Sequence, residues 1–237
     1  MRLLLGMSGA SGVVYGVRLL EVLQQLQQVE THLVMTPAAR ETISLETGRD
    51  PREVDELAGV VHRFGDIAAG PASGSFRLDA MAVVPCSMRT LSAIAYSLAD
   101  NLLVRAADVA LKERRPLIVA PRETPLHLGH LRSMVRLAEL GAVIAPPMPA
   151  FYHRPDSVSD IVDQTVNRLL DLLGLELPED LFRRWRGARA EARGQRGDGV
   201  AAGGDRAARP GAQLARSARM APRIGTVIVS ARLVQPT

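Results

Sequence analysis

The chain has 237 residues, 47% of them apolar, enough for one sizeable domain with a full core and a tail. Its net charge of +4 is unevenly distributed, because residues 188–237 hold nine arginines and three acids and leave about −2 for residues 1–187. A body with this charge does not offer a basic nucleic-acid surface, so we expect no nucleic-acid partner. No apolar run reaches the roughly 20 residues that cross a membrane, so we expect no membrane span.

The cysteine content and the two ends of the chain indicate the compartment and the domain boundary. Cys86 is the only cysteine, which excludes an intrachain disulfide and fits a reducing compartment. The apolar segment Leu3–Leu5 is too short for a signal peptide, because Gly6 follows at once. We therefore expect a cytoplasmic protein with a folded domain at 1–187. Residues 188–237 are rich in Ala, Gly and Arg and are predicted to be a disordered tail, in which Thr226–Val229 could add a strand or have no role.

Short apolar runs alternate with segments of helical periodicity throughout residues 1–187. This alternation predicts an α/β fold with an open parallel sheet and helices on both faces. The predicted strands are Leu3–Met7, Thr31–Met35, Met81–Val84, the apolar run before Arg122, and Ala142–Ala145. The predicted helices are Val13–Leu26, Ala38–Thr47, Pro51–Leu57, Leu91–Leu98, a helix that begins at Asp100–Asn101 and carries Lys112, His127–Leu140, Val158–Leu173 and Leu177–Trp185.

The first strand is followed by the small-residue loop Ser8–Gly12 and then by a helix. Small residues let the backbone approach a phosphate, and a helix N-terminus offers free N–H groups and a positive dipole end. The loop does not match the dinucleotide-binding fingerprint, so a plain tight turn explains it equally well. Thr36, at the end of the second strand, could donate a hydrogen bond to a ligand or merely cap the next helix. Glu46, at the end of that helix, could face either solvent or the site.

The third predicted strand leads into Cys86 and Ser87, and then into a helix. The hydroxyls of Ser87 and Thr90 lie at the start of that helix, where an anion is favoured. A thiol beside a helix N-terminus could be activated, but a small buried thiol is the preferred interpretation of Cys86.

Arg122 and Glu123 come directly after the next strand, where ligands bind in open α/β sheets. Lys112 is the only lysine against 28 arginines, which suggests a compact point charge at a phosphate, although a solvated lysine is the simpler alternative. Arg105 lies seven residues before Lys112, so the two share one helix face. A helix that precedes a strand runs antiparallel to it, which places Lys112 away from Arg122. We therefore expect a site completed by neighbouring subunits.

His127 and His130 form an H-x-x-H pair, which can bind a metal when a third ligand is close. The surrounding sequence supplies no acidic or thiol ligand, so we expect no metal. The long loop Gly65–Leu78 is rich in Gly, Ala, Ser and Pro, and loops of this length are often functional.

Eight segments of the chain form a series of motifs, in the order GMSGASGVVYGVRLL, ETHLVMTPAAR, SGSF, VVPCSMRTLS, RAADVALKERRPL, PRETPLHLGHL, PPMPAFYHRP and NRLLDLLG. Together these segments resemble the UbiX-type flavin prenyltransferases, once described as 3-polyprenyl-4-hydroxybenzoate carboxy-lyases. The resemblance covers about residues 1–186 in register.

This resemblance implies a Rossmann-like fold of the FMN-binding flavoprotein type, assembled as a homo-oligomer that is often dodecameric and needs no metal. It implies transfer of a dimethylallyl group from dimethylallyl phosphate to N5 and C6 of reduced FMN. The product, prenylated FMN, then serves a UbiD-type decarboxylase, in ubiquinone biosynthesis among other pathways. The sequence leaves open which decarboxylase is served, whether the donor is a mono- or diphosphate, and the number of subunits.

The resemblance also assigns site residues. Flavin-binding positions are Gly9, Ala10, Ser11 (near N5), Thr36, Ser87, Met88, Arg89, Thr90 and Arg122. Prenyl-phosphate positions are Arg105, Lys112, Glu123, Tyr152 and Arg168, the last two expected from a neighbouring subunit. Catalytic positions are Ser11, Lys112, Glu123 and Glu46, the last implicated in proton handling.

Three positions depart from the family pattern. Thr36 stands where serine is common, and Arg89 replaces the glycine of some relatives. Ile67 occupies a region where some members have a tryptophan that shields the allyl cation. The competing interpretations are a flavin-dependent cysteine decarboxylase, a non-catalytic FMN-binding subunit, and a direct decarboxylase of aromatic acids.

Overall fold

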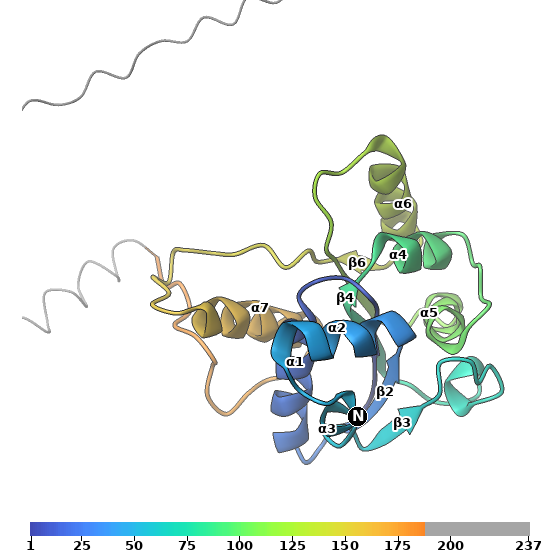
Figure 1. Ribbon diagram of the computed structural model, residues 1–237, viewed down its shortest axis with the longest axis horizontal. Helices are drawn as coiled ribbons and strands as arrows, with labels where there is room; N and C mark the ends of the chain where they lie inside the picture. The colour runs from blue at the N-terminus through green and yellow to red at the C-terminus, as the bar shows by residue number, and fades with distance from the viewer. Residues whose placement is uncertain (188–237) are drawn as a thin grey trace, which may run out of the picture. The chain divides into compact units, whose positions relative to one another are not determined.

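A computed structural model of the chain describes residues 1–187, and Figure 1 shows their arrangement. The predicted disordered tail, with Thr226–Val229, lies outside the described residues. Six parallel strands form one sheet in the order β3-β2-β1-β4-β5-β6. This is the strand order of a doubly wound nucleotide-binding fold. The strands are β1 (Arg2–Met7), β2 (Glu30–Met35), β3 (Val60–His62), β4 (Ala80–Cys86), β5 (Leu117–Pro121) and β6 (Val143–Ile144).

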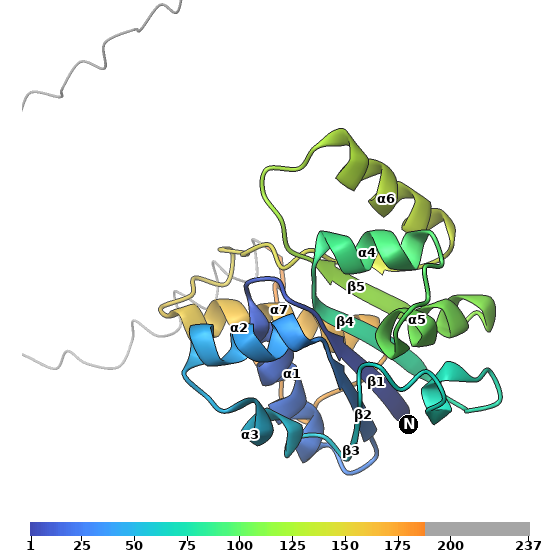
Figure 2. The ribbon, with the colours of Figure 1, turned by 45° about the vertical axis from the view of Figure 1, so that its right-hand side comes forward.

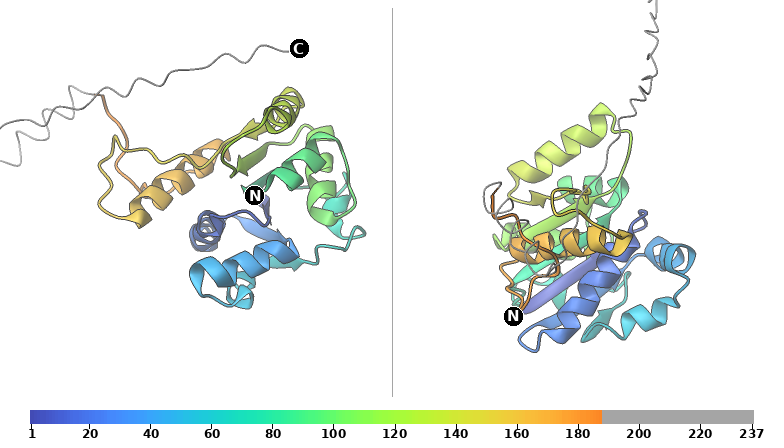
Figure 3. Two further views of the ribbon diagram at one scale, coloured as in Figure 1. Left: turned by 45° about the horizontal axis from the view of Figure 1, so that its top comes forward. Right: turned by 90° about the vertical axis from the view of Figure 1, so that its left-hand side faces the viewer.

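Helices cover both faces of this sheet (Figures 1 and 3). The helices α1, α2, α3 and α7 belong to one core, and α4, α5 and α6 belong to the other. None of the helices within residues 1–187 is both long and apolar enough to cross a membrane. The helices are α1 (Val13–Gln25), α2 (Pro37–Thr47), α3 (Pro51–Asp55), α4 (Met88–Ala95), α5 (Leu102–Lys112), α6 (Leu128–Glu139) and α7 (Val158–Leu172), with a 3₁₀ turn η1 (Gly70–Ala72).

The two cores follow from the two-residue period of the strands. On β1, Leu3 and Leu5 face the core beneath α1 and α7, while Leu4 faces the core beneath α5, and all three are fully buried. A parallel sheet covered on both faces reads as a continuous apolar run, which is why the strands were recognisable. The predicted open parallel sheet with helices on both faces is confirmed.

Gly16 allows α1 to lie close against the sheet. A Cβ at this position would be 2.4 Å from the Val84 carbonyl oxygen and 2.8 Å from the Met7 methyl carbon. The absence of a side chain therefore sets the distance between α1 and the ends of β1 and β4. The loop Ser8–Gly12, which joins β1 to α1, is held at that edge of the sheet.

The structure corrects two expectations about secondary structure. The predicted helix Leu177–Trp185 is wrong, because this segment has no helical turns. In a helix the Leu181 N–H would donate to the Leu177 carbonyl, but it donates to Asn167 Oδ1 at 2.8 Å instead. The short edge strand β3 was not predicted. It spans three residues, so it carries no periodicity that sequence analysis could detect.

Candidate functional site

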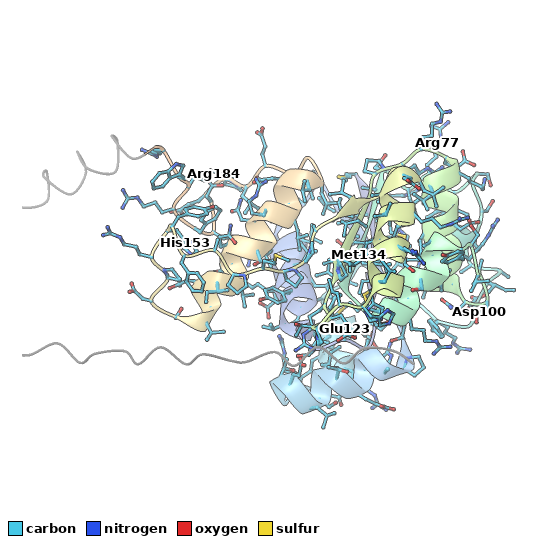
Figure 4. All side chains as sticks on the ribbon, turned by 90° about the horizontal axis from the view of Figure 1, so that it is seen from above. Arg77, Asp100, Glu123, Met134, His153 and Arg184 are labelled. Carbon is cyan, nitrogen blue, oxygen red and sulfur yellow. The ribbon has the colours of Figure 1, made fainter. Side chains whose placement is uncertain are left out.

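The loops that follow β1, β2, β4 and β5 lie together at the carboxyl ends of the strands, because parallel strands all end on the same side. We call this group of loops the carboxyl rim, comprising Ser8–Gly12, Thr36, Ser87–Thr90 and Arg122–Glu123. Nine of the predicted flavin positions, as well as Glu123, belong to it. Figure 4 places Glu123 near the middle of the molecule, between His153 on the side of α7 and Asp100 just before α5.

Ser8 ties two loops of the rim together, and sequence reasoning did not single it out. Its side chain is buried, donates to the Pro85 carbonyl at 3.2 Å and accepts from the Ser87 N–H at 2.7 Å. The loops after β1 and β4 are therefore held in register with each other. The available signal was a polar residue directly after the apolar run Leu3–Met7, where a buried hydroxyl needs partners.

Glu46 reaches from α2 to the N-terminus of α1. One of its carboxylate oxygens accepts from the Gly12 N–H at 2.8 Å and from the Val13 N–H at 3.1 Å. The expectation that this helix start offers free N–H groups to a phosphate is therefore wrong for Gly12 and Val13. A carboxylate is favoured there by the same dipole that would favour a phosphate.

Thr36 and Ser87 each cap a helix on the rim. Thr36 Oγ1 accepts from the Ala39 N–H at 3.0 Å, so the simple capping interpretation holds. This bond uses only the acceptor side of the hydroxyl, and its proton remains able to donate to a ligand. Ser87 Oγ accepts from the Thr90 N–H at 3.3 Å and donates to Thr90 Oγ1 at 3.1 Å. The bonded pair leaves the Thr90 hydroxyl proton for another acceptor.

The start of α4 and the end of β5 carry donors that other groups of the domain do not use. Within residues 1–187, the backbone N–H groups of Met88 and Arg89 have no hydrogen-bond partner, as expected in a first helical turn. The guanidinium groups of Arg89 and Arg122 are exposed, and neither forms an ion pair with the described part of the chain. Hydroxyls, first-turn N–H groups and guanidinium groups together form a donor set suited to a phosphate-bearing ligand.

Cys86 and Glu123 differ sharply in exposure. Cys86 is fully buried, and burial raises the pKa of its thiol well above the ordinary value. The prediction of a small buried thiol is confirmed. Glu123 is exposed, and its only described bond is to the Thr124 N–H at 2.9 Å. Its carboxylate can therefore accept a proton from a ligand at the rim.

Arg105 and Lys112 share one face of α5, beside the loop that contains η1. Arg105 donates to the Ala72 carbonyl at 3.1 Å and pairs with Asp108 at 3.0 Å. Lys112 pairs with the neighbouring Glu113, and it holds the pKa of that carboxyl below its usual value. A Cβ at Gly74 would be only 2.7 Å from Lys112 Nζ, so this glycine leaves room for the ammonium group. The predicted pair of cations on one helix face is thus present.

Tyr152 and Arg168 belong to the other side of the sheet. The Tyr152 hydroxyl accepts from Gln164 Nε2 at 3.3 Å, and Arg168 pairs with Asp171 at 2.7 Å on α7. Since α5 and α7 cover opposite faces, one chain does not bring Arg168 together with Lys112 (Figure 2). The resemblance implies that Arg168 reaches the pocket from a neighbouring subunit, and this assignment stays a prediction.

His127 has a local structural role. Its Nδ1 accepts from the Gly129 N–H at 3.0 Å and from the His130 N–H at 3.4 Å, so it caps α6. Among residues 1–187, no three His, Cys, Asp or Glu side chains are grouped as metal ligands. Ile67, in the long loop after β3, is 59% exposed.

The fold and the rim define an α/β protein whose strands end in a set of donors suited to a phosphate-bearing ligand. Comparison with known families agrees, since residues 1–170 match the model of the Flavoprotein family. Over 187 residues the chain is 62% identical to the flavin prenyltransferase UbiX of Escherichia coli K12, covering 79% of this chain and 99% of that protein. The chain belongs to the UbiX family of flavin prenyltransferases.

Solved structures give the same family. A dodecameric FMN-dependent UbiX-like decarboxylase from Escherichia coli O157:H7 superposes with a TM-score of 0.77 at 51% identity, covering 79% of this chain and all of that one. AnUbiX (PadA1) in complex with FMN and dimethylallyl pyrophosphate superposes with a TM-score of 0.75 at 49% identity, covering 78% and 97%. The FMN-dependent cysteine decarboxylase SpaF is only 21% identical, at a TM-score of 0.51, and shares the fold alone.

Proposed function

We propose that this enzyme transfers the dimethylallyl group of dimethylallyl phosphate to N5 and C6 of reduced FMN. The C–O bond to the phosphate breaks, and bonds to N5 and C6 form. One of the two displaced flavin protons leaves with inorganic phosphate, and one proton is taken up by the central prenyl carbon as the allyl double bond is consumed in ring closure. The observation that carries the proposal is 62% identity to a flavin prenyltransferase over nearly its full length. The donor chemistry of the carboxyl rim supports it independently.

The rim fits FMN as a ligand. We place the FMN phosphate at the start of α4, where the N–H groups of Met88 and Arg89 and the hydroxyl of Thr90 can donate to it, assisted by Arg122. Thr36 and Ser87 contribute hydroxyls to the same ligand. The loop residues Gly9, Ala10 and Ser11 line the flavin ring, with Ser11 near N5. Reduced FMN supplies the nucleophilic ring positions, and the protein orients them toward the donor.

The prenyl phosphate needs fixed positive charge, because phosphate leaves as an anion while the allyl fragment becomes cationic. Arg105, Lys112 and Arg168 supply that charge, because they can bind the phosphate of the donor and stabilise its negative charge. Tyr152 completes this pocket with its hydroxyl. Glu123 accepts or relays the proton lost during ring closure, and Glu46 assists proton handling from the α1 side.

The pocket requires more than one subunit. Lys112 and Arg168 lie on opposite faces of the sheet in one chain, so a neighbouring chain must supply Tyr152 and Arg168. We therefore propose a homo-oligomer with shared sites, assembled as a dodecamer like the UbiX-like structure of Escherichia coli O157:H7.

The product has a destination outside this enzyme. We propose that prenylated FMN is passed to a UbiD-type decarboxylase, in ubiquinone biosynthesis or aromatic acid breakdown. Because the substrate is reduced FMN, we place the enzyme in the reducing cytoplasm.

An anaerobic assay tests the reaction directly. Purified protein is mixed with reduced FMN and dimethylallyl phosphate, and the flavin is analysed by mass spectrometry. We expect a flavin heavier by one five-carbon prenyl unit in the wild type and little or none with Lys112→Ala. The matched control is Arg77→Ala, since Arg77 is exposed and has no described ion pair.

Unmodified flavin from a well-folded wild-type protein would overturn the proposal. Cysteine-containing peptides would then test the decarboxylase alternative, with release of carbon dioxide as the readout. Prenylation by Lys112→Ala at the wild-type rate would leave the reaction intact but remove the phosphate role assigned to Lys112.

A further inference from the structure

Residues 176–186 cross the outside of α7, and we call them the C-terminal strap. The strap is anchored by Asn167, whose side chain is 1% exposed. Asn167 accepts from the Leu181 N–H at 2.8 Å and donates to Asp180 at 3.4 Å. These bonds bring Arg184 over the last turn of α7. Figure 4 shows Arg184 and His153 on this side of the described domain.

Arg184 forms ion pairs with two carboxylates of the described residues, Asp171 and Asp180. Its two terminal nitrogens donate to both oxygens of Asp171, at 2.9 and 2.7 Å. Its Nε donates to Asp180 at 2.6 Å. Asp171 also accepts from Arg168 Nη1 at 2.7 Å, through one of the same oxygens. Two guanidinium groups therefore share one carboxylate, and Arg184 holds it by the bidentate geometry that is the stronger of the two.

The pKa of Asp171 also indicates that Arg184 is its stronger partner. Its pKa is lowered chiefly by the hydrogen bond from Arg184, and the contribution of Arg168 is smaller. Asp171 is 23% exposed, whereas Arg168 is 53% exposed and has no other described partner. Asp171 thus stays ionised and paired even when Arg168 turns away. Arg168 can leave this contact without stranding a half-buried negative charge.

The strap also packs against Tyr152, the residue that we assign to the prenyl-phosphate pocket together with Arg168. The Tyr152 ring lies 6.5 Å from the Phe182 ring and 6.1 Å from the Trp185 ring, both in edge-to-face orientation. The His153 ring meets Phe182 at 5.6 Å. Edge-to-face pairs at these distances fix ring orientation. The strap therefore contacts Tyr152 directly, and through Asp171 it affects the ion pairing of Arg168.

We propose that Arg184 is a positioning residue for prenyl-phosphate binding: it occupies Asp171 so that Arg168 is released to bind the phosphate of the donor. The proposal rests on the proposed function, which assigns Arg168 to the phosphate pocket. Without Arg184, Asp171 would keep Arg168 as its only described cationic partner and draw it away from the phosphate. The strap then tunes donor affinity while leaving the flavin rim unchanged.

The test compares Arg184→Ala with the double variant Arg184→Ala/Asp171→Asn. Arg184→Ala should raise the KM for dimethylallyl phosphate about tenfold, as expected for loss of one charge-assisted contact, with kcat and the Kd for FMN near wild type. Calorimetry with inorganic phosphate should show a parallel loss of affinity. The double variant should recover both values, because a neutral amide at position 171 no longer retains Arg168.

A purely structural role for Arg184 predicts a different result for donor binding by the double variant. If Arg184 only fastened the strap, removing Asp171 as well would not restore donor binding, and this outcome would overturn the proposal. The matched control is Arg186→Ala, an exposed strap arginine with no described ion pair, which should behave as wild type.

Asp171→Asn alone keeps the test decisive if Arg184→Ala fails to fold. Our proposal predicts a KM at or below the wild-type value, and a strap-fastening role predicts a higher one. Failure of the proposed function is distinguishable, because the wild-type protein would then form no prenylated flavin at all.

Discussion

Thr36 and Ser87 on the carboxyl rim are held by bonds to N–H groups three residues further along the chain. Arg184 of the C-terminal strap instead reaches thirteen residues back to Asp171, and Phe182 meets Tyr152 from thirty residues away. The rim is thus held by local caps and by hydrogen bonds from Ser8 and Glu46 to backbone groups, whereas the strap is held mainly by side-chain charge and ring contacts. Changes to the rim should alter flavin binding, and changes to the strap should alter donor binding.

The largest expected effect breaks the rim at Gly9. A Cβ here would be 2.4 Å from the Ala38 Cβ, so Gly9→Ala must displace the loop that we propose lines the flavin. Overpacking of this kind costs about 2 kcal/mol, or roughly thirtyfold in the Kd for FMN. Fluorescence titration with FMN measures it.

A paired substitution controls this prediction. Ala38→Gly removes the atom that the new Cβ would meet, so Gly9→Ala/Ala38→Gly should recover most of the FMN affinity. Gly65→Ala is the matched control, because nothing lies within 4 Å of its Cβ position. Equal loss of affinity in Gly9→Ala and Gly65→Ala would contradict the steric account.

The second largest effect is expected from a substitution of Asn167 that releases the strap. Asn167→Ala leaves the Leu181 N–H without its partner and leaves Asp180 paired with Arg184 alone, and it should lower the free energy of unfolding by about 1.5 kcal/mol. The KM for dimethylallyl phosphate should rise while the Kd for FMN stays constant. Urea unfolding and steady-state kinetics measure the two.

Ser159→Ala, at an exposed position of α7 without a described hydrogen bond, is the control for Asn167→Ala. An equal rise in the Kd for FMN and in the KM for the donor would show that the strap and the rim are not separable.

A smaller effect sharpens the description of the rim. Thr36→Val removes the cap of α2 and should cost about 1 kcal/mol of unfolding free energy. It also removes a hydroxyl proton proposed to bind FMN. Thr36→Ser retains the hydroxyl and should restore both. If Thr36→Val changes stability without changing FMN affinity, this hydroxyl serves only as a cap.

The smallest effect is expected at two histidines on β2 and the edge strand β3, and it should spare both the rim and the strap. His32 Nδ1 lies 2.9 Å from His62 Nε2, the rings are stacked, and Glu30 lies 3.2 Å from His32 Nε2. Burial lowers the pKa of both imidazoles below the ordinary value. At His32, the carboxylate of Glu30 partly offsets this lowering of the pKa. At His62, the neighbouring His32 lowers the pKa further, whereas Asp66 raises it.

The unfolded chain therefore binds more protons, and this cluster stabilises the fold above about pH 6.5, the ordinary imidazole value. That contribution should be lost as the pH falls through the lower folded values. Urea midpoints at about pH 7.5 and about pH 5.5 measure it. His62→Gln should show a smaller drop than the wild type, and an equal drop would assign the pH dependence to other groups.

Sequence analysis anticipated most of the fold because the strands are apolar runs and the helices carry capping residues. It anticipated Ser87 and Thr90 at a helix start, the buried thiol of Cys86, and the shared helix of Arg105 and Lys112. It missed Ser8, since a single buried serine has no pattern of its own. It also missed that Glu46 occupies the Gly12 and Val13 N–H groups, because α2 and α1 meet only in the folded chain.

Apart from β3 and the segment 177–185, the sequence by itself determined the succession of strands and helices along the chain, the capped helix starts, the placement of polar residues after β1, β2, β4 and β5, and the family. These features depend on neighbours within a few positions, where propensity and periodicity operate. Only the tertiary structure decided that α5 and α7 cover opposite faces, which separates Lys112 from Arg168. It also decided that residues 177–185 form a strap, since Asn167 takes the Leu181 N–H that a local helix would have used and Asp171 pairs with Arg184.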